Sequence, residues 1–347
     1  MIAKYDRLST KKISAATRVV TVTLNPAVDK TLWVPGFEAG KTFSVERSET
    51  VAGGKGVNVS RALKRLGIDS TATGIIGRDG SGPYLGALDA EGLSHDFVFV
   101  DGTLRTNVTV LACGGACGGE AHPAGRSGET HLREKGPAVA EAALAELEEK
   151  LKALIQDSCL VVFSGSLPLG LPDDSYGRLV ELAKSRGARS ALDSSGAPLR
   201  LGLKTKPFFI KPNAREVEES LGFLPEGEAG LMEAIRRYTA EGIEAVMISL
   251  GKEGLAYSRR ESAGGEGNFR ISAVRARISV ERPLNAVGSG DAALAGALAG
   301  ILSGFCAKDT ARLACAAGAA NTLVSGACIF SSEDVERLFG MTEVKTL

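Results

Sequence analysis

Short apolar runs alternate with helical segments through the middle of the chain, and this order restricts the fold more than any other feature. Periodicity predicts helices near residues 138–156, 173–186 and 228–241, and strands near 159–164, 189–193, 208–211 and 245–250. A strand that is followed by a helix and then by another strand favours parallel pairing, with the helix packed on the sheet. The expected fold is therefore α/β, with a doubly wound, mostly parallel sheet flanked by helices.

Each of these strands ends in a polar turn. The turns are Ser164-Gly165-Ser166, Asp193-Ser194-Ser195, Lys211-Pro212-Asn213 and Ser249-Leu250-Gly251. Because parallel strands all end at the same edge, these polar groups should gather there, where ligands of open α/β sheets bind.

Composition narrows the class of partner. The 347 residues carry 41 Lys and Arg against 41 Asp and Glu, so no general affinity for nucleic acid or an anionic membrane is expected. The long uncharged runs at 292–307 and 313–332 suit buried helices rather than membrane spans. The six cysteines form no C-x-x-C pair, which favours a reducing, cytoplasmic location.

A glycine-rich stretch at residues 285–296, NAVGSGDAALAG, stands directly before an alanine-rich helical segment. Its glycines should let the N–H groups of Gly288, Ser289 and Gly290 converge at the positive end of that helix, forming an anion hole. Asp291 would repel a bound phosphate unless it has another task, such as taking a proton from an attacking hydroxyl. The stretch indicates phosphoryl transfer.

The same stretch also satisfies the weaker dinucleotide pattern G-x-G-x-x-A, with Asp309 about 20 residues further on. Asp309 lies between two helical segments rather than at a strand end, which argues against that reading. A dinucleotide-dependent oxidoreductase nevertheless stays as a rival, which a nucleotide-binding assay would separate.

A second glycine-rich turn, AGGKGVNVS at 52–60, leads into a helix and lacks the spacing of a Walker P-loop. It offers close backbone approach at Gly54, a cation at Lys55 and an amide at Asn58. Asp29 is expected just beyond the strand at 19–24, where it suits sugar hydroxyls and a turn or cap equally well.

Looser alternation interspersed with charges occurs at 31–51 and 93–112, and we predict that these segments form a small β-sheet lid. The kinase-like core would comprise 18–30, 52–92 and 113–340. The open edges of such a lid predict a homodimer formed through it, because unpaired strand edges are rarely tolerated.

Two further segments carry no predicted chemistry. Residues 1–17 contain several basic and hydroxyl residues without an apolar stretch, and we expect a disordered extension rather than a secretory signal. Residues 112–127 are rich in Gly and Ala, and we expect a loop insertion.

Taken together, the motifs resemble those of the ribokinase-like carbohydrate kinases of the phosphofructokinase B family, and most closely its 1-phosphofructokinase and tagatose-6-phosphate kinase branch. The resemblance runs from about residue 19 to residue 339. It rests on TLNPAVDKT at 23–31, AGGKGVNVS at 52–60, SGSLP at 164–168, KPNAREVEE at 211–219, SLGKEG at 249–254 and NAVGSGD at 285–291.

For the sugar side, the resemblance implies contacts from Asp29, Gly54 and Asn58, with the substrate's phosphate held by Lys55 and Arg105. Asp291 corresponds to the catalytic base, beside the anion hole at residues 286–290. Ala286 departs from the hydroxyl residue that is usual at its position.

For the nucleotide side, the resemblance implies ATP and Mg²⁺ as cofactors. Asn213 and Glu216 match the family's N-x-x-E, with Glu216 acting on Mg²⁺ through water. The other implied nucleotide contacts are Ser249, Gly251, Gly254, Gly288, Gly290 and Asn321.

The expected activity is therefore an ATP-dependent phosphotransferase acting on the hydroxyl of a phosphorylated ketohexose, foremost fructose 1-phosphate. Tagatose 6-phosphate and fructose 6-phosphate remain open as substrates, since the same cations could hold either end of the sugar. A non-catalytic sugar-phosphate sensor is the rival from another class, although a pure binder gains nothing from Asp291 and Glu216 beside a triphosphate.

Overall fold

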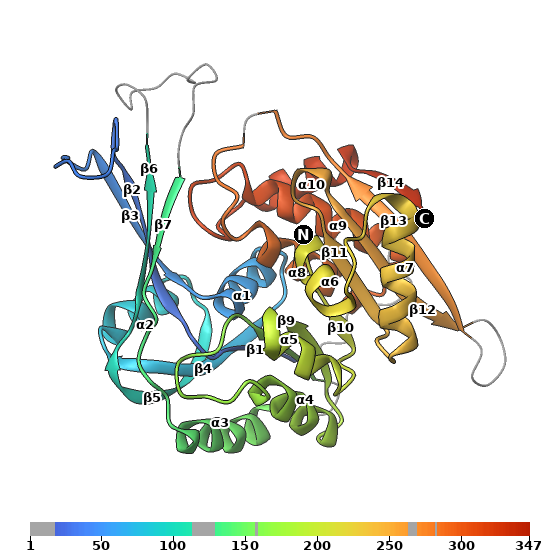
Figure 1. Cartoon of the computed structure of the whole chain (residues 1–347), viewed down its shortest axis with the longest axis horizontal. Coiled ribbons are helices and arrows are strands. Elements are labelled where there is room, and N and C mark those ends of the chain that lie inside the picture. Colours follow the sequence, from blue (N-terminus) through green and yellow to red (C-terminus); the bar gives the residue numbers. More distant parts are fainter. Residues whose placement is uncertain (1–17, 113–128, 157–158, 263–268, 282) are drawn as a thin grey trace.

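Ten strands form the central sheet of the computed structural model, in the order β14-β13-β12-β11-β10-β9-β8-β1-β4-β5 (Figure 1). The structure describes residues 18–112, 129–156, 159–262, 269–281 and 283–347. The predicted extension at 1–17 and nearly all of the predicted insertion at 112–127 lie outside these residues. Pairing is parallel from β5 through to β11 and antiparallel from β11 to β14. This confirms the predicted α/β fold.

The elements follow the chain in alternation. The strands of the central sheet are β1 (Val19–Thr23), β4 (Ser70–Asp79), β5 (Ser94–Thr103), β8 (Leu160–Ser164), β9 (Arg189–Asp193), β10 (Phe209–Ile210), β11 (Ala245–Ser249), β12 (Leu255–Ser262), β13 (Phe269–Arg277) and β14 (Glu343–Thr346). The helices are α1 (Lys55–Arg65), α2 (Ser81–Ala90), α3 (Glu141–Leu154), α4 (Ser175–Ser185), α5 (Gly196–Leu203), α6 (Ala214–Leu221), α7 (Gly227–Ala240), α8 (Ser289–Leu302), α9 (Ala307–Asn321) and α10 (Ser332–Met341), with a short 3₁₀ helix at Gly251–Glu253.

Both faces of the central sheet are covered by helices, because successive side chains of a strand point to opposite faces. Leu160 and Val162 of β8 belong to the apolar cluster shared with α1, α8, α9 and α10. Val161 and Phe163 of the same strand belong to the cluster shared with α3 to α7. The continuous apolar runs seen in the sequence are thus strands buried on both sides.

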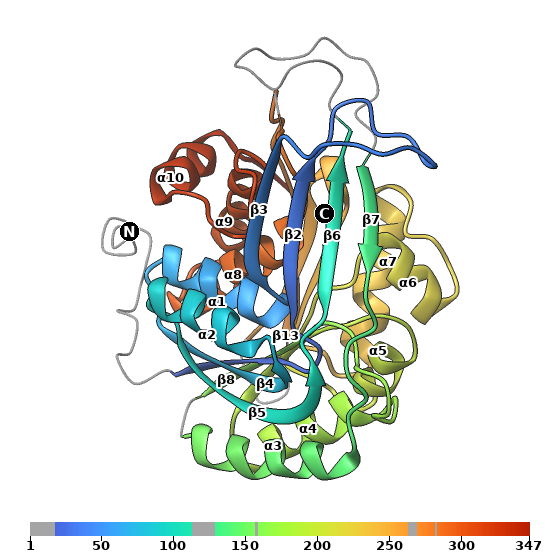
Figure 2. The same ribbon diagram turned by 90° about the vertical axis from the view of Figure 1, so that its left-hand side faces the viewer.

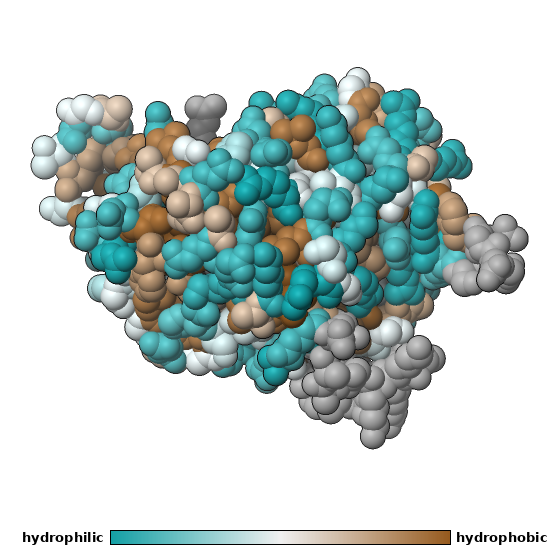
Figure 3. All heavy atoms as spheres, turned by 90° about the horizontal axis from the view of Figure 1, so that it is seen from below, coloured by the Kyte–Doolittle hydropathy of each residue, from teal (hydrophilic) through white to brown (hydrophobic). Residues whose placement is uncertain are grey.

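Helix α3 illustrates how the outer layer forms. Leu144, Leu147 and Leu151 are spaced to lie on one helix face and are buried, whereas Glu146 and Glu149 are exposed. Figure 3 looks onto the molecule from below, where hydrophilic side chains cover much of the surface and apolar ones occur in small groups.

The direction in which the chain is wound changes beside β1. From β1 the chain adds β4 and β5 on one side, and it then returns to add β8 to β11 on the other. The carboxyl ends of β1 and β8 therefore border a switch point, which is where open α/β sheets bind ligands.

A separate four-stranded sheet, the lid sheet, projects from one end of the central body (Figures 1 and 2). Figure 2 shows its strands side by side in the order β3-β2-β6-β7. These strands are β2 (Ala27–Trp33), β3 (Arg47–Gly53), β6 (Thr106–Leu111) and β7 (Glu129–Arg133). Strand β2 pairs antiparallel with β3 and parallel with β6.

Three details of the predicted lid are wrong. Residues 94–103 form β5, which pairs in parallel with β4 in the central sheet and buries Phe97 and Val98. Asp29 lies inside the lid strand β2, not in a turn at the end of β1. Residues 129–133, assigned to the core, supply the fourth lid strand, β7. In each case a short run with charged neighbours has the same local pattern in either sheet. Only the strand with which it pairs decides which sheet it joins.

Candidate active site

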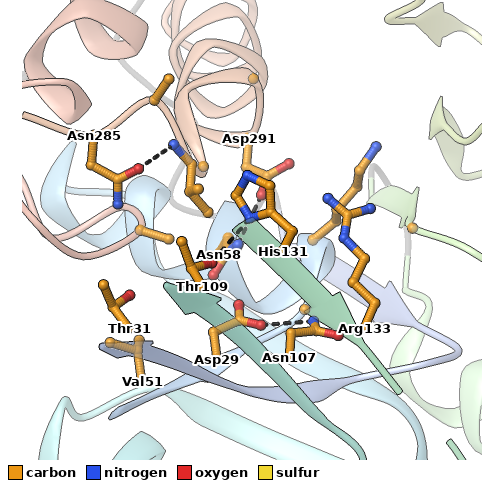
Figure 4. Close-up of a pocket in the computed structure, with 18 of the residues that line it drawn as sticks. Asp29, Thr31, Val51, Asn58, Asn107, Thr109, His131, Arg133, Asn285 and Asp291 are labelled. Atoms are coloured by element: carbon orange, nitrogen blue, oxygen red, sulfur yellow. Dashed lines mark hydrogen bonds between the residues drawn. The ribbon is translucent and has the colours of Figure 1, made fainter. Parts of the chain in front are cut away.

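A cavity of about 710 Å³ lies at the switch point, beneath the lid sheet. It is lined by residues that follow β1 and β8, by the N-terminal ends of α1 and α8, and by one face of the lid sheet. Figure 4 shows lid side chains and Asp291 converging on this space from opposite sides. The edge of the sheet at which ligand binding was predicted therefore contains a cavity.

Glycines at the N-terminus of α8 line the cavity, and they place no side chain of their own between the helix end and the cavity. Gly288 caps the helix with φ of 83°, and a Cβ there would lie 2.7 Å from the Cβ of Ala327. Only glycine fits this conformation and this contact. A Cβ at Gly290 would lie 3.5 Å from Nζ of Lys211, so a cation stands beside the positive end of the helix. The surroundings of this turn favour an anion.

The predicted anion hole needs one correction. The N–H of Ser289 donates to the carbonyl of Ala286 at 3.1 Å, and Ser289 does not line the cavity. The left-handed backbone at Gly288 closes a tight turn, and this turn takes up the Ser289 N–H. Gly288 and Gly290 do line the cavity, so the backbone at these two positions remains available to a ligand.

Asp291 lies in the first turn of α8, and its side chain is buried at the cavity wall. Its Oδ2 accepts a hydrogen bond from Nδ2 of Asn58 at 2.8 Å (Figure 4). Burial raises the pKa of Asp291 to about 6, with Asp193 adding to the rise and Lys55 and Asn58 opposing it. A carboxylate whose pKa lies close to neutral pH is well matched to general base catalysis.

Two lysines share the buried carboxylate of Asp193. Its Oδ1 lies 3.3 Å from Nζ of Lys55 and 3.1 Å from Nζ of Lys211. Burial alone would raise the pKa of Asp193, but the two ammonium groups outweigh it and hold that pKa below its usual range. Asp193 in turn raises the pKa of Lys55, so Lys55 is cationic at neutral pH. This cluster of Lys55, Lys211 and Asp193 thus carries two positive charges against one negative charge.

One face of the lid sheet contributes polar side chains from every strand. They alternate along each strand, as the side-chain period of two requires. They are Asp29 and Thr31 on β2, Glu49 on β3, Asn107 and Thr109 on β6, and Glu129, His131 and Arg133 on β7, and the apolar Val51 of β3 also lines the cavity. Figure 4 shows Arg133 and His131 on the same side as Asp29 and Asn107.

Asp29 is anchored at the base of the lid. Its Oδ1 accepts from Nδ2 of Asn107 at 2.8 Å, and burial raises its pKa. A Cβ at Gly53 would lie 2.0 Å from Oδ2 of Asp29, which explains a glycine at that position. A carboxylate that is held so firmly and lines the cavity suits hydrogen bonding to hydroxyls.

Arg105 lines the cavity and also donates hydrogen bonds to backbone carbonyls. Its guanidinium donates to the carbonyls of Asn25 at 2.8 Å, Pro26 at 3.3 Å and Glu134 at 3.2 Å. Burial lowers its pKa, although an arginine stays charged under any physiological condition. These contacts fix the segment between β1 and β2 and the segment after β7 to each other, and they leave part of the guanidinium for a ligand.

Comparison with known proteins decides the family. The pattern that defines the pfkB family carbohydrate kinases matches residues 19–334. The chain belongs to this family. It is 30% identical over 330 residues to a 1-phosphofructokinase of Borreliella burgdorferi, covering 95% of this chain and 99% of that protein. It is 35% identical over 303 residues to a 1-phosphofructokinase of Rhodobacter capsulatus, covering 86% of this chain and 88% of that protein.

Solved structures agree with the observed fold. Phosphofructokinase-2 of Escherichia coli superposes with a TM-score of 0.81 at 23% identity, covering 93% of this chain and 98% of that one. Arabidopsis thaliana ribokinase gives a TM-score of 0.67 at 20% identity, covering 93% and 99%. The chain is thus a pfkB carbohydrate kinase with a ribokinase-like fold, a phosphotransferase with an alcohol acceptor, as predicted. Kinases of this family use ATP.

The structure of this pfkB kinase brings most of the predicted site residues together. The larger cavity is lined by Asp29, Gly54, Lys55, Asn58, Arg105, Glu216, Gly288, Gly290 and Asp291. A second cavity of about 380 Å³ is lined by three of the predicted nucleotide contacts, namely Asn213, Ser249 and Gly251. The binding roles of these residues remain predictions.

Asn213 and Glu216 link the two cavities through the start of α6. The side chain of Asn213 accepts from the N–H of Glu216 at 2.9 Å, and the carboxylate of Glu216 accepts from the N–H of Asn213 at 2.9 Å. This reciprocal capping box fixes the Glu216 side chain at the cavity wall. Burial raises its pKa, so the carboxylate lacks full compensation from protein charges.

Two predicted nucleotide contacts are placed elsewhere. Asn321 is fully buried, and its amide donates to the carbonyl of Val287 at 2.8 Å and to Oγ of Ser289 at 3.0 Å, while its oxygen accepts from the N–H of Cys328. It therefore supports the turn before α8 from behind. Gly254 lines neither cavity, and a Cβ there would lie 2.1 Å from the carbonyl oxygen of Ala276.

Sequence reasoning missed several lining residues, chiefly Lys211, Asn107, Thr109, His131 and Arg133. The alternation in ETHLR at 129–133 was the available signal for β7. Among the residues that the structure describes, no cluster of three or more His, Cys, Asp or Glu side chains could hold a metal ion. No helix in the described part of the chain is long and apolar enough to cross a membrane.

Proposed function

We propose that this kinase transfers the γ-phosphoryl group of ATP to the 6-hydroxyl of fructose 1-phosphate, giving fructose 1,6-bisphosphate and ADP. The observation that carries the proposal is the buried carboxylate of Asp291, which lines the same cavity as the anion-favouring turn before α8 and the cations Lys55, Arg105 and Arg133. A neutral sugar would offer these cations no negative charge to bind. The relatives named 1-phosphofructokinase support the same substrate.

The chemical step follows from the position of Asp291. Its carboxylate takes the proton of the acceptor hydroxyl as that oxygen forms a bond to the γ-phosphorus and the bond to the bridging oxygen of ADP breaks. The hydrogen bond from Asn58 and the nearby Lys55 stabilise the ionised carboxylate before the step. Gly288 and Gly290, with Lys211 beside them, face the negative charge of the transferred group.

The acceptor's own phosphate needs cations to bind it. Lys55, Arg105 and Arg133 all line the cavity and supply them. Asp29, Gly54 and Asn58 line the same cavity and offer acceptors and donors for the sugar hydroxyls.

Glu216 fits a role toward Mg²⁺. It is a single carboxylate at the cavity wall, and burial raises its pKa because nearby protein charges do not fully compensate its negative charge. Mg²⁺ at nucleotide sites uses one or two carboxylates together with phosphate oxygens and water. Bound Mg²⁺ would neutralise charge on the nucleotide phosphates. The N–H of Asn213 holds the Glu216 carboxylate in place for Mg²⁺. Asn213 itself lines the second cavity together with Ser249 and Gly251.

We also infer a homodimer formed through the lid. In the described chain β3 and β7 are the outer strands of the lid sheet, each paired on one side only. Such edges are normally covered, and a second copy can supply the cover.

The test is a coupled assay of ADP release with MgATP and, in turn, fructose 1-phosphate, fructose 6-phosphate and tagatose 6-phosphate. The expected result is the highest kcat/KM for fructose 1-phosphate. Preference for either 6-phosphate would overturn the substrate assignment and keep the kinase. ATP binding without turnover on any of the three would instead mark a sugar-phosphate sensor.

A further inference from the structure

Arg61 is a charged residue on α1 that is 1% exposed, and the predicted chemistry gives it no role. A guanidinium has five N–H donors, and here each of the five has an acceptor. Nε and one Nη2 donor bind the carboxylate of Glu91, the latter at 3.0 Å. The others reach Oδ1 of Asn58 at 3.0 Å, the carbonyl of Ala327 at 3.5 Å and the carbonyl of Ala52 at 2.7 Å.

Two of these acceptors, Asn58 and Ala327, line the catalytic cavity. A third, Ala52, lies near the end of the lid strand β3. Ala327 also packs against Gly288, the cap of α8. One side chain therefore ties the lid strand, helix α1 and the loop behind the α8 N-terminus to one another.

The contact with Asn58 bears on the base directly. Because Oδ1 of Asn58 accepts from Arg61, the amide nitrogen of Asn58 points the other way, toward Oδ2 of Asp291. An amide held at one end and donating at the other has one orientation only. The order Arg61, Asn58, Asp291 is thus a hydrogen-bonded chain from a buried cation to the carboxylate.

We propose that Arg61 is a positioning residue for phosphoryl transfer, which acts through Asn58 to orient Asp291 and through Ala52 to hold the lid strand in register with it. The inference rests on the proposed role of Asp291 as the base. Stability alone is a weak reason for such a residue, since buried ion pairs can often be replaced by well-packed apolar side chains without loss.

Arg61→Lys is the informative substitution, because it keeps the positive charge but cannot reproduce the planar fork of five donors. We expect kcat to fall about 10- to 100-fold, because misplacing a reacting group by about 1 Å lowers the rate by up to about 100-fold. KM for ATP should stay within about twofold, because no Arg61 contact reaches the second cavity.

The pH dependence gives a readout that a purely structural role would not move. A weakened hydrogen bond from Asn58 favours the protonated carboxyl, so the acid limb of kcat should shift to higher pH in Arg61→Lys. The other charged groups that act on Asp291 are Lys55, Asp193 and Lys211, and they are unchanged in this variant. The ionisation of the substrates is common to both proteins and cancels in the comparison.

Two controls separate positioning from folding. Glu91→Gln removes the charge partner of Arg61 but keeps its contacts to the cavity walls, so it should lower Tm while kcat and the acid limb stay as in the wild type. Arg65→Lys, one helical turn further on at an exposed position of α1, should change nothing. Arg61→Gln is the second test variant, and it avoids burying an ammonium group with unmet donors.

The outcomes are distinct. If Arg61→Lys or Arg61→Gln, measured per folded molecule, keeps wild-type kcat and the wild-type acid limb while Asp291→Asn is inactive, the positioning role is wrong and the base assignment stands. If Asp291→Asn itself keeps its kcat, the proposed function is what fails. A loss of kcat with a shifted limb in the Arg61 variants, absent from Glu91→Gln, supports the proposal.

Discussion

Asn58 and Asp291 are 233 positions apart in the sequence, and the Nδ2 atom of the first lies 2.8 Å from Oδ2 of the second. This bond joins the first turn of α8 to helix α1, and so joins the proposed phosphate side of the cavity to the proposed sugar side. It is where the two glycine-rich motifs of the chain meet. Asn58 donates to the ionised form of Asp291, which keeps a buried carboxylate usable as a base.

Replacing Asp291 with Asn should abolish most of the activity without weakening the fold. Asn keeps the shape but cannot accept the hydroxyl proton, so we expect kcat to fall about 10²- to 10⁴-fold. Steady-state kinetics and thermal unfolding check this. Asp309→Asn, at the start of the adjacent helix α9, is the matched control and should retain wild-type kcat. An Asp291→Asn protein with more than a tenth of wild-type kcat would contradict the mechanism.

The stability difference between Asp291→Asn and the wild type should depend on pH. The folded pKa of Asp291 is raised from 3.8 to about 6, so the folded state prefers the protonated carboxyl. That stabilisation is complete below pH 3.8 and is lost as pH rises through 6. The variant should therefore gain Tm relative to the wild type between about pH 4 and pH 7. The comparison involves no substrate, so titration of a sugar phosphate near pH 6 does not interfere. A constant Tm difference across this range would refute the raised pKa.

Lys55→Met should weaken binding of the sugar phosphate far more than binding of ATP. A charge-assisted contact contributes about 1.5 to 3 kcal/mol, or roughly 10- to 150-fold in KM. Initial rates with each substrate varied in turn measure both constants. Lys30→Met, on an exposed lid position, controls for loss of a nearby charge. Equal increases in both KM values would remove Lys55 from the sugar-phosphate site.

Arg133→Met tests whether β7 belongs to the substrate site. We expect a rise in KM for fructose 1-phosphate with kcat for the bound substrate nearly unchanged, since Arg133 lines the cavity and, in the proposed mechanism, holds the substrate's phosphate rather than the reacting group. Lys135→Met, just beyond the strand at an exposed position, is the control. Unchanged kinetics in the Arg133 variant would confine the phosphate anchors to Lys55 and Arg105.

The lid edges predict a dimer in solution. Light scattering at micromolar protein should give about twice the chain mass of 36.0 kDa. Val45→Asp introduces a charge at an exposed apolar residue of the connection between the lid strands β2 and β3 and should shift the mass toward the monomer, whereas Leu224→Asp, exposed away from the lid sheet, should not. A wild-type monomer would mean that the edges are protected in another way.

Much of the fold could be predicted because its signals are local. The continuous apolar run of a strand such as β8 and the glycine demanded by the left-handed turn at Gly288 depend on a few neighbouring residues. The polar turns that end the strands could be placed at one edge of the sheet because parallel strands all end at the same edge. The prediction failed for β5 and β7, whose local patterns do not say which sheet they join.

The sequence by itself determined the α/β order, the two glycine-rich turns and the carboxylate that follows the second of them. Only the tertiary structure decided that Asp193 lies between Lys55 and Lys211, that Asn321 supports a turn rather than lining a cavity, and that Arg61 reaches Asn58 and Ala52. Helix and turn signals arise from backbone constraints over a few residues. Which side chains meet across long separations depends instead on how the whole core packs and on which buried charges must find partners.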